Sequence, residues 1–103
     1  MLNKLYESGL ISHLLNLQKA KAVIIFGSIA RGDWYKGSDI DIFIFGGAKG
    51  IEKNKYEMKL HRDIELHIFG SKKEIKAVKT GLINNIINGF IIKGSIQEFA
   101  EVS

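Results

Sequence analysis

Two aspartates, Asp39 and Asp41, stand one residue apart at the start of an apolar run that extends to Phe45. Such a run is typical of a buried β-strand, and residues i and i+2 of a strand point to the same side. Two carboxylates on one side repel each other unless a cation lies between them. Because hard oxygen ligands favour Mg²⁺ or Mn²⁺, the pair predicts a metal site that would bind the phosphates of a nucleoside triphosphate.

A glycine–serine pair, Gly27 and Ser28, follows another β-branched run over residues 22–26. Ten residues separate Ser28 from Asp39. Glycine has no side chain, so the backbone can approach a ligand closely at this point. The Ser28 hydroxyl and the amides after it can donate to phosphate oxygens, and a helical turn within residues 29–38 would add its free amides. The pattern therefore predicts a phosphate-binding corner beside the aspartates.

A third carboxylate is expected from residues 63–69, which alternate between polar and apolar types and predict another strand. Asp63 and Glu65 share one side of that strand. We prefer Glu65, because it lies inside the strand between two apolar residues, and Asp63 is the alternative third metal ligand. His67 lies on the same side, but an ordinary surface histidine is the simpler interpretation for it and for His61.

The remaining segments predict the elements that position this cluster. Helical spacing extends over residues 2–19, where Gly9 weakens the pattern, Ser12 could cap a shorter helix and His13 is expected to be structural. The other expected elements are a helix at residues 51–60, a capping box at residues 71–74, a helical stripe at 75–86 that ends at 88–89, and a strand at 90–92. The prediction is an α+β fold: a single domain over residues 1–103, with its core at about 22–94, in which helices pack against a mixed sheet of about four strands.

Composition narrows the function classes. The chain has no cysteine, which excludes disulfides, zinc–thiolate sites and thiol catalysis and fits a cytoplasmic location. No apolar run approaches the roughly 20 residues that span a membrane, and the first residues do not resemble a signal peptide. A net charge of +4 and a pI near 9.4 favour anionic partners such as nucleotides, nucleic acid or an acidic protein, although a solvated lysine surface would give the same values.

The spacing of Gly27 and Ser28, ten residues, then Asp39, Ile40 and Asp41 resembles the nucleotidyltransferase superfamily that includes DNA polymerase beta. Within it, the chain is most similar to the minimal nucleotidyltransferases, or MntA-like proteins, of bacteria and archaea. The residues that carry this closer likeness are the continuation Ala30, Arg31, Gly32, Asp33, the Ser38 before Asp39, and residues 87–94, which resemble the closing helix and strand of that group. The third acidic residue of the group is usually aspartate, whereas the matching residue here is Glu65.

This resemblance implies a nucleotidyltransferase fold and a Mg²⁺-dependent transfer of a nucleoside monophosphate, AMP from ATP, to a hydroxyl acceptor. The implied catalytic and metal-binding residues are Asp39, Asp41 and Glu65, and the implied nucleotide-binding residues are Gly27, Ser28, Arg31 and Ser38. It also implies a partner, because minimal nucleotidyltransferases are commonly antitoxins of HEPN-family ribonuclease toxins, and some transfer AMP to a tyrosine of the toxin.

Two alternatives to this enzyme stay open. One is a binding module without activity that neutralises its partner by contact, and the other is a small nucleic-acid-binding domain that uses the lysines. Both a homo-oligomer and a hetero-oligomer are compatible with the sequence. The presence of both Asp39 and Asp41 favours the enzyme, because a protein that only binds its partner has no need of the pair.

Overall fold

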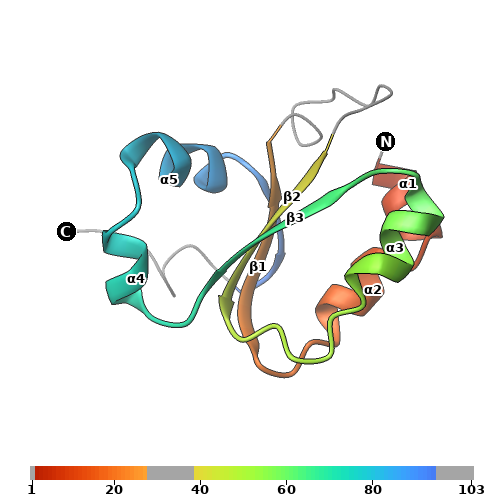
Figure 1. Ribbon diagram of the computed structural model, residues 1–103, viewed down its shortest axis with the longest axis horizontal. Coiled ribbons are helices and arrows are strands. Elements are labelled where there is room, and N and C mark those ends of the chain that lie inside the picture. The colour runs from red at the N-terminus through yellow and green to blue at the C-terminus, as the bar shows by residue number, and fades with distance from the viewer. Residues whose placement is uncertain (1, 28–38, 95–103) are drawn as a thin grey trace.

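The computed structural model describes residues 2–27 and 39–94 of the chain, with side chains described from residue 4 onward. The expected α+β fold with a mixed four-stranded sheet is confirmed (Figure 1). The described helices are α1 (Leu2–Glu7), α2 (Leu10–Leu15), α3 (Lys53–Leu60), α4 (Lys72–Lys76) and α5 (Thr80–Ile87). The described strands are β1 (Ala20–Phe26), β2 (Ile40–Gly46), β3 (Ile64–Phe69) and β4 (Phe90–Lys93).

The sheet has the strand order β3-β2-β1-β4. Strand β1 is antiparallel to both of its neighbours, whereas β2 and β3 are parallel and are joined through α3. A parallel pair needs such a crossover because its second strand must start again at the same edge of the sheet. As a result, the end of β1 and the starts of β2 and β3 meet at one edge of the sheet.

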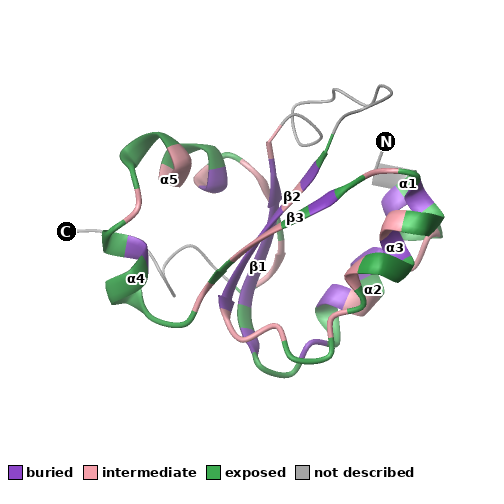
Figure 2. Ribbon diagram, viewed as in Figure 1, coloured by how far each residue is buried: buried purple, intermediate pink, exposed green. Residues whose placement is uncertain are grey.

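The two faces of the sheet are covered by different helices. Helices α1, α2 and α3 lie on one side and α4 and α5 on the other (Figure 1). Strands β1 and β2 contribute alternate residues to the two sides, with Ile42 and Ile44 in the core against α1–α3 and Phe43 and Phe45 in the core against α4 and α5. Both strands are buried almost along their whole length (Figure 2), which is why their sequences are continuous apolar runs.

The first helical segment is broken where its glycine predicted a weakness. Gly9 has a φ of +88°, a conformation that glycine adopts freely, and it separates α1 from α2. The expectation that Ser12 caps the shorter helix was wrong, because Ser12 lies inside α2 and the cap position is Gly9. The nearby hydroxyl that does accept a bond is Ser8 Oγ, which lies 3.2 Å from the Leu10 amide nitrogen.

His13 has the structural role that the sequence predicted. Its Nε2 accepts a hydrogen bond of 3.0 Å from the amide of Glu52, the residue at the N-cap of α3. Its ring stacks on Tyr56 with the ring centres 5.0 Å apart. The histidine therefore joins α2 to the start of α3.

The capping box at Ser71 and Glu74 is confirmed, and so is the helix end at residues 88–89. The stripe over residues 75–86, however, lies on two helices and not on one. The backbone of Lys79 is extended between α4 and α5, so that α5 starts in a new direction while Ile75 and Ile86 still face the same core. No helix in the described part of the chain is long and apolar enough to cross a membrane.

Candidate active site

Three strands bring side chains into line at the edge of the sheet where β1 ends and β2 begins. Phe26, at the end of β1, pairs with Asp41 of β2, and Asp41 pairs with Glu65 of β3. These three residues form one row across the α4–α5 side of the sheet. The next row inward consists of Ile24, Phe43 and His67. The carboxylates therefore stand at the rim of an otherwise apolar face.

Asp41, Glu65 and His67 can each place one ligand atom within 4.8 Å of those of the other two. His67 Nε2 lies 3.4 Å from Asp41 Oδ1, and the two side chains are only 20% and 22% exposed, respectively. The Glu65 side chain is exposed. Two carboxylates and an imidazole on neighbouring strands suit a divalent cation, which would relieve the repulsion between the acids.

Burial acts on Asp41 more strongly than its partners do. Partial burial raises the pKa of the Asp41 carboxyl above its usual value of 3.8, although the contact with His67 lowers it. The negative charges of Glu65 and Asp39 add to the upward shift of this pKa. The carboxyl is thus held where its own negative charge is disfavoured, which is the electrostatic condition that a bound cation would reverse.

Gly27 fits closely against Asp41. Its φ is +85°, and a Cβ built on its backbone would overlap Asp41 Oδ2 and lie 3.2 Å from Asp41 Cγ. A side chain at residue 27 would therefore displace the carboxylate. Gly27 therefore lies directly beside Asp41, whereas phosphate binding at this corner stays a prediction.

The other predicted site residues are placed as follows. Asp39 is exposed just before β2, close enough to influence the pKa of Asp41 but outside the group of three. Asp63 is exposed before β3, also outside the group, and its carbonyl oxygen accepts a bond of 2.8 Å from the Ile40 amide. Of the two candidates for the third ligand, the group of three thus contains Glu65, which is exposed and not the buried residue that our argument assumed; its binding of a metal stays a prediction. The predicted nucleotide-binding residues Ser28, Arg31 and Ser38 lie outside the described residues.

His67 is the member of the group that the sequence interpretation passed over as a surface residue. Its ring lies against Phe26 with centres 5.0 Å apart and a tilt of 56°, and its nitrogen faces Asp41. Alternation along residues 63–69 already places it on the side of Glu65. What the sequence lacks is the register between β2 and β3, which brings it within reach of Asp41. His61, by contrast, is exposed and lies outside the group, as expected.

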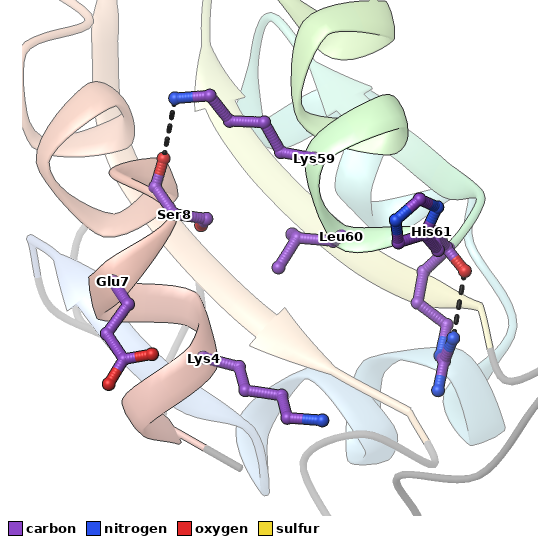
Figure 3. A pocket seen from close by; sticks show the side chains of 7 residues that line it. Lys4, Glu7, Ser8, Lys59, Leu60 and His61 are labelled. Carbon is purple, nitrogen blue, oxygen red and sulfur yellow. Dashed lines mark hydrogen bonds between the residues drawn. The ribbon is translucent and has the colours of Figure 1, made fainter.

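A hollow lies on the opposite side of the sheet, between α1 and the end of α3 (Figure 3). Its volume is about 510 Å³, and its lining is rich in positive charge. Lys59 Nζ donates to the Ser8 carbonyl oxygen at 3.2 Å, and Arg62 Nη1 donates to the His61 carbonyl oxygen at 2.8 Å. The lining residues are Lys4, Glu7, Ser8, Lys59, Leu60, His61 and Arg62.

Comparison with known proteins agrees with this fold. Residues 9–97 match the polymerase beta nucleotidyltransferase family, so the chain belongs to that family of nucleotidyltransferases. Among solved structures it is similar to a toxin–antitoxin crystal structure with AMP-PNP, with a TM-score of 0.57 and 21% identity over 93% of this chain and 75% of the other. It is likewise similar to a mutant of the toxin–antitoxin MntA–HpeT, with a TM-score of 0.58 and 19% identity over the same shares. No curated protein matches the chain.

Proposed function

We propose that this domain, comprising residues 1–103, transfers a nucleoside monophosphate, AMP from ATP, to a hydroxyl group of another molecule in a Mg²⁺-dependent reaction. The observation that carries the proposal is the contact of Asp41 with both Gly27 and the Glu65–His67 pair at one edge of the sheet. In the reaction the acceptor oxygen bonds to the α-phosphorus, the bond from that phosphorus to the bridging oxygen breaks, and pyrophosphate leaves. Divalent cations supply charge neutralisation for the attacking and leaving oxygens.

The residues at this edge would divide the work. Asp39 and Asp41 would hold the cations, and Glu65, on the neighbouring strand, would hold the cation nearest the acceptor and accept the proton of its hydroxyl. Gly27 and Ser28 would bind the β- and γ-phosphates through their backbone amides and the serine hydroxyl, and Arg31 and Ser38 would add contacts to the nucleotide. Catalysis would then consist mainly of positioning and charge neutralisation.

For the acceptor, we infer a tyrosine hydroxyl of a HEPN-family toxin, which this chain would inactivate as an antitoxin. Support comes from the solved toxin–antitoxin structures that share the fold, one of them with AMP-PNP. The described part of the chain has one sheet and a carboxylate group at its rim. An acceptor presented by a partner protein suits an edge of this kind.

The test uses ATP labelled at the α-phosphate, Mg²⁺ and the protein encoded beside this gene. We expect label on the partner with the wild-type chain, and a loss of at least about 100-fold with Asp41→Asn, since that carboxylate would hold both cations. Asp63→Asn is the matched control, because Asp63 is outside the group; it should keep activity within about 3-fold. Failure of Mg-ATP to bind at millimolar concentration would contradict the proposal.

The basic hollow supports a second candidate function, binding of an anionic surface without chemistry. Lys4, Lys59 and Arg62 outnumber Glu7 in its lining, which favours acidic protein or nucleic acid. An antitoxin that acts by contact alone should protect against its toxin equally well after Asp41→Asn. If the chain instead binds RNA, the affinity should fall steeply with added salt and should weaken on Lys59→Ala. Neither the salt nor the Lys59→Ala substitution is expected to have this effect on the nucleotidyltransferase.

A further inference from the structure

We propose that His67 is a direct ligand of the cation bound by Asp41 and Glu65, and that it makes the site selective for first-row transition ions such as Mn²⁺ and Co²⁺ over Mg²⁺. This inference rests on the proposed function only in that both require a cation at Asp41. The family resemblance implies carboxylates at this edge, and the imidazole is added here from the structure.

The position of His67 in the sheet is the first argument. It belongs to the row of Ile24 and Phe43, and the row beyond it consists of Ala22, Phe45 and Phe69. Ile24 and Phe43 are essentially fully buried, so this face would accept an apolar residue at position 67. A polar ring there costs desolvation unless its nitrogen gains a strong interaction.

The partner of that nitrogen is the second argument. Within the described residues, the hydrogen-bonding partner of the His67 ring is Asp41, at 3.4 Å. This separation is longer than the roughly 2.7–3.2 Å of a good N–H···O bond. It is near the distance of about 3 Å between neighbouring ligand atoms on an octahedral ion with bonds of about 2.1 Å. The pair is therefore only weakly hydrogen-bonded, and a small shift of either side chain would bring both atoms onto one ion.

The contact with Phe26 is the third argument. The ring of Phe26, itself 3% exposed, lies tilted against the imidazole and limits its rotation. A ligand held in this way loses little conformational freedom when a cation arrives. Phe26 also directly precedes Gly27, so the residue that orients His67 is continuous with the corner that contacts Asp41.

The ligand types decide the selectivity. Mg²⁺ and Mn²⁺ both accept hard oxygen ligands, but Mg²⁺ keeps several of its waters, whereas first-row transition ions also accept an imidazole nitrogen, Co²⁺ more strongly than Mn²⁺. A site of two carboxylates and one imidazole would thus gain affinity for Mn²⁺ and Co²⁺ from His67 but little affinity for Mg²⁺. Loss of His67 should separate these ions.

The experiment titrates Mn²⁺ by electron paramagnetic resonance, Co²⁺ by its absorption and Mg²⁺ by competition with Mn²⁺, all without nucleotide. We expect His67→Asn to weaken Mn²⁺ and Co²⁺ about 10-fold or more and to change Mg²⁺ less than 2-fold. His61→Asn is the matched control, because His61 is exposed and outside the group. His67→Phe serves as a second variant, since the apolar face should accept that ring and keep the fold.

A direct signature comes from the hyperfine coupling between bound Mn²⁺ and an imidazole nitrogen. It should be present in the wild type and in His61→Asn and absent from both His67 variants. Absence of the coupling in the wild type, or an equal loss of Mg²⁺ and Mn²⁺ affinity in His67→Asn, would overturn the inference and make His67 a positioning residue. If the wild type bound no divalent cation at all, the proposed function would fail with it.

Discussion

At the scale of single residues, the contact between Gly27 and Asp41 joins backbone conformation to chemistry. Gly27→Ala would place a methyl group against the Asp41 carboxylate at a φ of +85°, a backbone conformation that costs a residue with a side chain about 1–2 kcal/mol. We expect this variant to lose divalent-cation binding as well as stability. Calorimetric titration with Mn²⁺ and thermal unfolding would measure the two effects.

Gly50 offers the matched control for this prediction. It too has a positive φ, +92°, but nothing lies within 4 Å of a Cβ built there. Gly50→Ala should therefore show the cost in stability alone and bind Mn²⁺ like the wild type. Equal binding by both alanine variants would mean that the carboxylate does not depend on the space beside Gly27.

At Asp41, unlike at Gly27 and Gly50, we expect a substitution to increase stability. Since burial raises its pKa, the folded protein holds this proton more tightly than the unfolded chain does. The resulting stabilisation is present below the usual pKa of 3.8 and is lost as the pH rises through the folded value. At neutral pH the ionised carboxylate thus lowers the free energy of unfolding, and Asp41→Asn should raise Tm when chelator removes all divalent cations.

This gain should shrink as the pH falls below 3.8, where the wild-type carboxyl is itself neutral. Thermal unfolding of both proteins at pH 7 and at acid pH, with chelator present, measures it. A lower Tm for Asp41→Asn at neutral pH would show that the contact with His67 outweighs desolvation. The ionised Asp41 carboxylate would then stabilise the folded protein.

At the scale of elements, the capping box shows how a local pattern fixes a helix start. Ser71→Ala would leave the Glu74 amide without its hydroxyl partner, and loss of an N-cap costs about 1 kcal/mol. Ser12→Ala is the control, since Ser12 is exposed inside α2, where alanine is the better helix former. Denaturant unfolding should show destabilisation for Ser71→Ala only, and neither variant should alter Mn²⁺ binding.

The elements also show what the sequence could predict. Strands β1 and β2 were predictable because both faces of each are buried, which produces unbroken apolar runs, and the Ser71–Glu74 cap was predictable because it involves neighbours in the chain. The break between α4 and α5 was not, because the spacing of Ile75 and Ile86 fits either one helix or two that face the same core.

The candidate site likewise contains residues that the sequence could predict and residues that it could not. Gly27, Asp39 and Asp41 could be chosen from spacing, since they flank one connection between adjacent strands. The approach of Glu65 and His67 to Asp41 depends on the register of a parallel pair joined by a crossover, and no local pattern specifies that register. For this reason His67 was taken for a surface residue.

At the scale of the whole molecule, a cation that binds only the folded protein should stabilise it. At a concentration 100 times its Kd, such an ion adds about 2.7 kcal/mol to the free energy of unfolding. We expect Mn²⁺ to raise the Tm of the wild type in a concentration-dependent way and to leave that of Asp41→Asn unchanged. Equal shifts in both proteins would mean that the ion acts elsewhere, for example at exposed carboxylates.

The position of β3 at one side of the sheet, as an edge strand, has a further consequence. Glu65 and His67 come from this strand, whereas Asp41 comes from the central strand β2 and Gly27 directly follows the central strand β1. Local unfolding of β3 would thus remove two proposed ligands together and leave Gly27 and Asp41 in place. Cation binding and the pairing of β3 with β2 would then be thermodynamically linked, and each would favour the other. A protein that displaced β3 could thus release the cation without contacting the site.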